Sequence, residues 1–250
     1  MKFLAILAVA TSCLAKEIPP NLQAFYDSVR NSGPCTGADL LQGGFHDQQG
    51  TSNEWGYCQR DFAGKGLYIK GPGDSLANMD IDCDGDQTNV DPRCQGSDDT
   101  QGATTWRDQV QRFNITDLNS SIHPYVVLGN VGAVSFDPRD HGIHPLSVVA
   151  VVCGGQLIYG VWGDINGADD GVSLVGEASL ALATACFGQS MTACFGQSMT
   201  AHNGHDASDV LYLAFSGRHA VPRRANWGAR NYADFEASIS ALGDSLVAGV

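Results

Sequence analysis

The spacing of apolar residues predicts a helix near each end of the chain. After Pro19-Pro20, apolar side chains recur at the three- and four-residue intervals of one helix face, and the pattern stops at Asn31-Ser32-Gly33. These side chains are Leu22, Phe25, Tyr26 and Val29. A second stripe follows Asn231, which is placed to cap a helix with Asp234 three residues on. Its apolar members are Tyr232, Phe235, Ile239, Leu242 and Leu246.

Between these helices the apolar runs are short and rich in β-branched and aromatic residues, which indicates strands. The predicted strands are residues 66–70, 125–128, 147–153, 156–162 and 210–215. Gly154-Gly155 separates two of them and favours a type I′ hairpin, because both central residues of that turn need positive φ. Residues 178–186 read as a helix, and the rest of the region up to about residue 120 reads as loops. The pattern predicts a β core with helices attached at its ends.

Residues 1–15, MKFLAILAVATSCLA, have the features of a secretory signal peptide. One Lys precedes an apolar run that is too short to span a bilayer, and small residues suited to a peptidase follow. A buried helix is the alternative interpretation. We expect residues 16–250 to form a single secreted, extracellular domain, since no later run reaches the roughly 18 unbroken apolar residues of a transmembrane helix.

Loss of the leader removes Cys13 and leaves an odd number of cysteines, which is unexpected in an oxidising compartment. They are Cys35, Cys58, Cys83, Cys94, Cys153, Cys186 and Cys194. A repeat accounts for the odd number, because ACFGQSMT at 185–192 recurs unchanged at 193–200. Without one copy, six cysteines remain, which predicts three disulfides. Either Cys186 or Cys194 is then left as a free thiol, and their spacing does not choose between them.

The chain is acidic, with 27 Asp and Glu against 14 Lys and Arg and a formal net charge of −13. The leader holds Lys2 and no acidic residue, so its removal makes the charge more negative still. A negative field concentrates cations, which disfavours nucleic acid as a partner and suits a polycationic substrate. Simple solubility is the alternative explanation of this charge.

Two carboxylates, Asp164 and Glu177, lie at opposite ends of one Gly-rich stretch. Asp164 directly follows a strand-like run and Glu177 opens a helix-like run, so both are expected at the rim of the core. Glycoside hydrolysis needs one protonated carboxyl group for the leaving oxygen and one ionised carboxylate to activate water or attack carbon. In the structural alternative, Asp164 shapes a turn and Glu177 caps the helix, where the macrodipole favours an anion.

Seven strings, in this order, resemble the fungal chitosanases of glycoside hydrolase family 75: NMDIDCDGD, HPYVVLGN, PLSVVAVVC, YGVWGDINGADD, VGEASLALATACFG, GHDASDVLYLAFSG and NYADFEASISALGD. The resemblance implies an endo-acting hydrolase of chitosan, a β-1,4-linked glucosamine polymer, that inverts the anomeric centre. It places the family's essential Asp and Glu on Asp164 and Glu177, with Glu177 as proton donor and Asp164 as base. We expect a monomer without a cofactor, metal ion or membrane partner.

For the fold we expect a β-rich α+β domain with a six-stranded double-psi-like β-barrel core, peripheral helices and disulfide-stapled loops. A strand that ends in Gly-Asp before a Gly-rich loop resembles the turns of that class. Barrels of this kind also serve as non-catalytic wall-binding proteins. The alternative function is therefore a secreted polysaccharide-binding protein that the 185–200 duplication has inactivated.

Three further patterns leave alternatives open. Trp55, Tyr125 and Trp162 fit either sugar-stacking walls or the core. Residues 80–91 copy much of an EF-hand calcium loop, although position 12 is Asp and a Cys lies inside, so calcium binding, acidic substrate contacts and a solvated loop are all possible. Asn114-Ile-Thr and Asn119-Ser-Ser are glycosylation sequons that lie too close together for a glycan on both.

Overall fold

The computed structural model describes residues 16–48, 52–96, 100–167, 172–188, 200–201 and 203–250. The predicted leader and most of the second ACFGQSMT copy lie outside these ranges. The strands are β1 (Leu40–Asp47), β2 (Trp55–Cys58), β3 (Gly66–Lys70), β4 (Ala77–Asp82), β5 (Tyr125–Asn130), β6 (Val148–Cys153), β7 (Gln156–Asn166), β8 (Leu174–Val175), β9 (Glu177–Ser179) and β10 (His205–Phe215). The α-helices are α1 (Pro20–Asn31), α2 (Arg107–Val110), α3 (Leu180–Phe187) and α4 (Tyr232–Val247). The 3-10 helices are η1 (Gly37–Asp39), η2 (Pro92–Cys94), η3 (Gln111–Phe113), η4 (Pro138–His141) and η5 (Arg218–Ala220).

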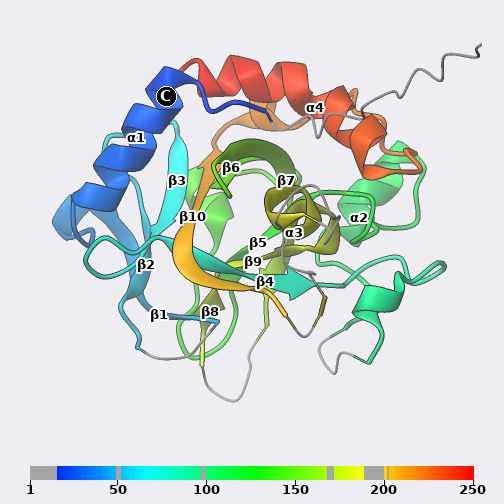
Figure 1. The fold of residues 1–250 in the computed structure, drawn as a ribbon, viewed down its shortest axis with the longest axis horizontal. Helices are drawn as coiled ribbons and strands as arrows, with labels where there is room; N and C mark the ends of the chain where they lie inside the picture. Colours follow the sequence, from blue (N-terminus) through cyan, green and yellow to red (C-terminus); the bar gives the residue numbers. More distant parts are fainter. Residues whose placement is uncertain (1–15, 49–51, 97–99, 168–171, 189–199, 202) are drawn as a thin grey trace, which may run out of the picture.

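Six strands close into a barrel in the order β4-β9-β5-β7-β6-β10, and β10 returns to pair with β4 (Figure 1). The β4–β9 and β5–β7 pairs are parallel, and the other four pairs are antiparallel. Closure gives each barrel strand a hydrogen-bonded neighbour on both sides, so no barrel edge is left without a partner. The α+β fold with a six-stranded barrel core is confirmed.

Four more strands continue from β10 in the order β3, β2, β1, β8. Disulfides join Cys35 to Cys58, Cys83 to Cys94 and Cys153 to Cys186. The three predicted disulfides are therefore confirmed, and Cys186 is the partner that the sequence left undecided. Cys194 lies outside the described residues.

Helices α1 and α4 lie along one side of the barrel (Figure 1). Asn21 at the start of α1 donates from Nδ2 to the carbonyl oxygen of Val247 at the end of α4, over 2.8 Å. The predicted cap of α4 is present, because the Asn231 side chain accepts the Asp234 N–H at 2.9 Å. In the part of the chain that the structure describes, none of the helices has the length and apolar character needed to cross a membrane.

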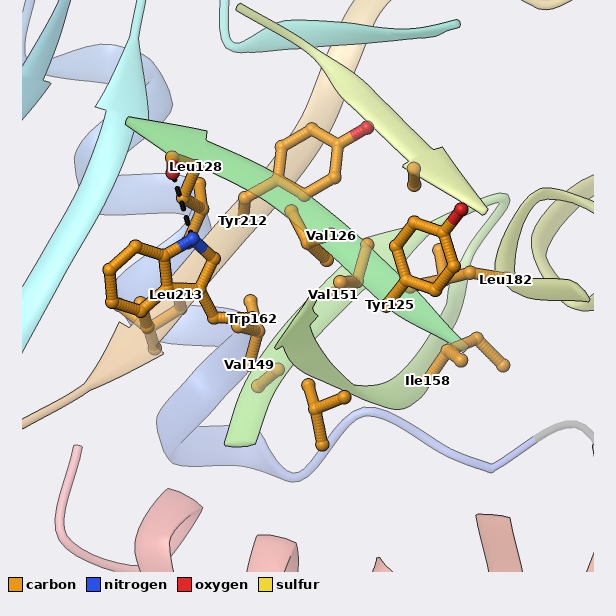
Figure 2. Packing of buried hydrophobic residues seen from close by; sticks show 14 of the residues in the cluster. Tyr125, Val126, Leu128, Val149, Val151, Ile158, Trp162, Leu182, Tyr212 and Leu213 are labelled. Atoms are coloured by element: carbon orange, nitrogen blue, oxygen red, sulfur yellow. Dashed lines mark hydrogen bonds between the residues drawn. The ribbon is translucent and has the colours of Figure 1, made fainter. Parts of the chain in front are cut away.

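Side chains from several barrel strands pack together in the core, among them Tyr125 of β5, Val151 of β6, Trp162 of β7 and Tyr212 of β10 (Figure 2). The indole N–H of Trp162 donates to the carbonyl oxygen of Leu128 at 2.8 Å, so its one polar atom is satisfied inside an apolar core. Tyr125 and Trp162 are fully buried, and Trp55 is 4% exposed. None of the three presents a face to a sugar, so the interpretation as sugar-stacking walls is wrong and the core alternative holds.

The region before residue 120 contains more sheet than its sequence predicts. Strand β3 was expected, but β1, β2 and β4 were not. The four residues of β2 are all buried, so they show no alternation of apolar and polar side chains. In β4 apolar and polar residues alternate, but polar Asn78 and Asp82 are buried as well as the apolar residues. A buried carboxylate of this kind hides a strand from pattern analysis.

Candidate active site

The sheet register places Asp164 and Glu177 on either side of one residue of β5. Val127 pairs with Asp164 of β7 on one side and with Glu177 of β9 on the other. Directly paired residues of neighbouring strands carry their side chains on the same face of a sheet. Two strand spacings separate the two Cα atoms, which is about 10 Å. The barrel therefore brings the two predicted site residues to one face with a gap of one strand between them.

A bulge at Gly163 sets the direction of Asp164. Trp162 pairs with Val126 and Asp164 pairs with Val127, so Gly163 is the extra residue in β7. A Cβ at Gly163 would lie 2.5 Å from the Cβ of Tyr125, so only glycine fits there. The Trp162 indole also donates to the carbonyl oxygen of Asp164 at 2.8 Å. The Trp-Gly-Asp string is thus a packed bulge, and Asp164 lies within β7, not after the strand as predicted.

Glu177 begins a strand and does not open a helix, which corrects the predicted helix start. Strand β9 precedes α3, and Ser179 is the helix cap, since its side chain accepts the Leu182 N–H at 3.3 Å. Gly176 before the strand has φ +96°, a backbone conformation that glycine adopts without strain. The helix-capping interpretation of Glu177 is therefore wrong. Glu177 is 9% exposed, and its Oε2 accepts a hydrogen bond from Nδ2 of Asn166 at 3.1 Å.

One carboxylate oxygen of Asp164 is fully engaged and the other is not. Oδ1 accepts the backbone N–H of Thr105 at 2.9 Å, the Thr105 hydroxyl at 2.6 Å and the backbone N–H of Ile165 at 2.7 Å. Oδ2 is buried and has no hydrogen-bond partner within the described part of the chain. Burial raises the pKa of Asp164 to about 6, against the lowering effect of the Thr105 and Ile165 donors.

A second carboxylate fixes the segment that holds Asp164. Asp117 is 3% exposed and accepts the Thr104 backbone N–H at 3.0 Å and the Thr104 hydroxyl at 2.6 Å. Thr104 is joined to Thr105, so both donors to Asp164 are anchored through Asp117. No pattern in the sequence predicted this support, because the two threonines lie in a polar stretch without periodicity.

Asp82 and Asp84 join the site, and neither was predicted as a catalytic group. One carboxylate oxygen each of Asp82, Asp84 and Asp164 lie within 4.8 Å of one another, and all three residues are buried. Oδ1 of Asp82 accepts the Asp84 backbone N–H at 2.6 Å and lies 3.0 Å from the Tyr125 hydroxyl. Burial, then the neighbouring Asp164 and Asp84, raise the pKa of Asp82 well above its usual range.

A small polar cavity of about 40 Å³ opens at this cluster. Asp82, Asp84 and Glu177 line it, whereas Asp164 is not among its described lining residues. The other lining residues are Gln101, Val127, Ile165, Asn166 and Gly167. The cavity can hold a water molecule or a small polar group between carboxylates that come from β4, the loop after it and β9.

Residues 80–91 do not form an EF-hand loop. Asp80 and Asp82 belong to β4, and Asp91 caps η2 by accepting the Arg93 N–H at 2.9 Å. The Cys83–Cys94 disulfide crosses the segment. Asp82, Asp84 and Asp164 bring three carboxylate oxygens together, fewer than the six to eight oxygens that Ca²⁺ takes. The other interpretation, acidic contacts at a substrate site, fits the position of Asp82 and Asp84 at the cavity.

Comparison with known proteins identifies the family. Residues 79–249 match the family described as fungal chitosanase of glycosyl hydrolase group 75. The chain belongs to this family. The match begins within β4 and includes every other barrel strand, and it contains Asp82, Asp164 and Glu177. The predicted resemblance is confirmed, and the protein is a glycoside hydrolase.

Two named relatives match this chain over its whole length, and a third matches part of it. An endo-chitosanase of Aspergillus oryzae (strain ATCC 42149 / RIB 40) is 41% identical over 260 residues, which covers 100% of this chain and 99% of the relative. An endo-chitosanase of Aspergillus fumigatus is 41% identical over 254 residues with the same coverage. Endo-chitosanase C of A. oryzae is 30% identical over 172 residues, or 69% of this chain and 38% of that protein.

Proposed function

We propose that this chain is a secreted endo-chitosanase that hydrolyses β-1,4-glucosamine linkages in chitosan by an inverting mechanism, with Asp164 and Glu177 as the acid/base carboxyls. The observation that carries the proposal is the pairing of both residues with Val127, which sets them on one face with one strand between them. Inverting enzymes keep their two carboxyl groups about 6.5 to 9.5 Å apart to admit water, whereas retaining enzymes need about 5 Å. Two strand spacings between the Cα atoms leave room for a water molecule between the two side chains, as inversion requires.

Charge supports chitosan as the substrate. Chitosan carries ammonium groups, and the site offers buried carboxylates at Asp82, Asp84 and Asp164 in addition to Glu177. An ammonium close to carboxylates forms charge-assisted hydrogen bonds that an acetylated amine does not form. The named relatives are endo-chitosanases, which agrees with this substrate.

We also propose that the protein is secreted. The predicted signal peptide at 1–15 and the disulfides both suit an oxidising compartment. We expect a monomer that acts without a cofactor and carries an N-linked glycan. Of the two sequons, Asn114 is exposed, which favours it as the site of the glycan.

Release of reducing ends from chitosan by the purified protein tests the proposal. Asp164→Asn and Glu177→Gln should each lower kcat by about a hundredfold or more, the usual contribution of a general acid or base. Asp27→Asn and Glu54→Gln are matched controls, because both residues are exposed and lie outside the site, and they should keep wild-type activity. NMR of the first product should show the α-anomer. Equal activity in all variants, or a β-anomer product, would refute the catalytic assignment or the inversion respectively.

A deletion tests the alternative of an inactivated binding protein. A variant without residues 193–200 keeps one ACFGQSMT copy and retains Cys186, the observed partner of Cys153. Wild-type protein and the deletion variant should hydrolyse chitosan at similar rates. Activity confined to the deletion variant would instead establish that the duplication has inactivated the natural chain.

A further inference from the structure

We propose that Asp82 and Asp164 share one proton, and that this carboxyl pair is the general acid, with Asp82 as the member that meets the substrate. The proposal rests on the proposed glycoside hydrolysis. It makes Glu177 the base, and so reverses the roles that the family resemblance implies for Glu177 and Asp164.

Position separates Asp82 from Asp164. Asp82 lines the cavity together with Glu177, whereas Asp164 does not, although oxygens of Asp82 and Asp164 lie within 4.8 Å of each other. A group that donates a proton to a sugar oxygen must come within hydrogen-bond reach of that oxygen. Asp82 can meet this condition from the cavity wall, whereas the Oδ2 of Asp164 is buried and its Oδ1 is occupied by three donors.

The hydrogen bonds of the two carboxyl groups leave room for one proton between Asp82 and the Oδ2 of Asp164. Oδ1 of Asp164 takes three donors, and Oδ1 of Asp82 takes the Asp84 N–H and lies beside the Tyr125 hydroxyl. Oδ2 of Asp164 is buried and has no partner in the described residues. A proton held by Asp82 and directed at this oxygen would satisfy a polar atom that is costly to leave unpaired.

The surroundings require that the pair holds a proton. Among the described residues, the titratable groups that act on the pair are Asp84, Asp117 and Tyr125, none of which is cationic, and Glu177 lines the same cavity. Two adjacent buried carboxylates without a counter-charge cannot both ionise readily, so one stays protonated over a wide pH range. The three donors on Asp164 favour its anion, which leaves the proton on Asp82.

The reaction takes one proton from the pair and delivers one to Glu177. The Asp82 proton moves to the glycosidic oxygen while the bond between that oxygen and the anomeric carbon breaks. A water oxygen bonds to the anomeric carbon from the opposite face, and Glu177 takes the water proton. The anion formed on the pair is held by the donors to Asp82 and Asp164. Exchange with solvent then returns a proton from Glu177 to the pair.

Substrates with different leaving groups test these roles. Asp82→Asn should lower kcat on chitosan by about a hundredfold or more. On a 2,4-dinitrophenyl glycoside of a glucosamine oligomer, whose leaving group needs no proton, the same variant should keep activity within about tenfold of wild type. Glu177→Gln should lose activity on both substrates, because activation of water is still required.

Asp84→Asn is a second test, and only its pH profile is compared with wild type because Asp84 itself lines the cavity. The anion of Asp84 raises the pKa of Asp82. The alkaline limb of the kcat profile, which reports the acid, should therefore move to lower pH in this variant. A merely structural role for Asp82 would not predict this displacement.

Three outcomes would overturn the proposal without touching chitosan hydrolysis itself. Asp82→Asn could keep the wild-type kcat on chitosan, or it could lose activity equally on both substrates. In the third outcome, Glu177→Gln and not Asp82→Asn would keep its activity on the aryl glycoside. A cation site would also overturn it. In that case Ca²⁺ would raise the Tm of the wild type, a chelator would reverse the effect, and Asp82→Asn would abolish it. If wild-type protein releases no reducing ends from chitosan, the proposed function itself fails.

Discussion

Asp164 illustrates how a fold can hold one carboxyl group in two different environments. Its Oδ1 is surrounded by donors from Thr105 and Ile165, whereas its Oδ2 is buried without a partner in the described structure. Donors favour the charged form and burial opposes it, and burial has the larger effect on the pKa. The site thus keeps a carboxyl in an unfavourable state, which costs stability and provides chemistry.

Because burial of the charged Asp164 costs stability, its replacement by a neutral residue should stabilise the protein in a pH-dependent way. The pKa of Asp164 rises from 3.8 to about 6 on folding, so the folded protein binds more protons than the unfolded chain between these values. Stability from this group is present at low pH and is lost as the pH rises through 6. Asp164→Asn should therefore be more stable than wild type at pH 7, by about 3 kcal/mol, but not at pH 4. Chemical denaturation at both pH values measures the difference, and parallel curves would contradict it.

The two sequons differ in the freedom of their side chains. Asn114 is exposed after η3, whereas the Asn119 amide accepts the Ser121 hydroxyl at 2.8 Å and donates to the carbonyl oxygen of Asp86 at 3.3 Å. We expect the protein secreted from a eukaryotic host to carry its glycan on Asn114. Intact mass should fall by one glycan in Asn114→Gln and stay the same, apart from the substitution, in Asn119→Gln. A glycan lost only in Asn119→Gln would show that the engaged amide is the acceptor.

At the scale of elements, the sequence predicts best where a strand or helix is apolar and regular. Strands β3, β5, β6 and β7 and helix α4 were all foreseen from their patterns. Strand β4 alternates apolar and polar residues but was missed, because Asp80 and Asp82 also begin the calcium-like pattern of residues 80–91. Strand β9 was predicted as helix because Glu177-Ala178-Ser179 runs directly into α3. These two strands supply Asp82 and Glu177, so the pattern failed where the site departs from ordinary core packing.

The sequence predicted two residues of the site, Asp164 and Glu177, but not the role of Asp82. Asp164 and Glu177 stood out because they flank one Gly-rich loop, and the barrel does bring them to one face. Asp82 appeared only as part of an imperfect calcium motif. Its proximity to Asp164 depends on strands that are far apart in the chain, and local spacing carries no information about such pairings.

The Cys83–Cys94 disulfide fixes the element that carries Asp82 and Asp84. Cys83 lies between these two residues and is bonded to Cys94 of η2. Replacing both cysteines by Ser should lower the free energy of unfolding by about 3 kcal/mol, because the unfolded chain gains entropy. It should also lower kcat at temperatures well below Tm, since the position of Asp82 is released.

Removal of the Cys35–Cys58 disulfide is the control for this prediction. That bond closes a longer loop, and neither cysteine lines the cavity. Its loss should lower Tm and leave kcat close to wild type. Calorimetry and initial rates on chitosan compare the two double variants, and equal effects on kcat would argue against a role of the Cys83–Cys94 bond in the site.

At the scale of the whole molecule, the net charge of −13 predicts a salt-dependent encounter with chitosan. A negative field attracts a polycation, and salt screens this attraction within about 10 Å at 0.1 M. We expect kcat/KM to fall as NaCl rises from 20 to about 500 mM, with little change in kcat at saturation. Chitosan that has been partly reacetylated, with fewer ammonium groups, should show a weaker dependence. Identical salt slopes for both polymers would mean that long-range attraction does not drive binding.

The closed barrel also bears on how the protein behaves at high concentration. In the described structure, the strands beyond the barrel end at β8, which is only two residues long and pairs with β1. Edge strands with unpaired backbone groups are where one molecule adds to the sheet of another and aggregation begins. The longer edge is β1, because β2 pairs with it between Leu40 and Phe45 on one side, whereas β8 on the other side pairs only with His46 and Asp47. In the described structure, a second molecule that extends the sheet would therefore have to add at β1 and not at the barrel.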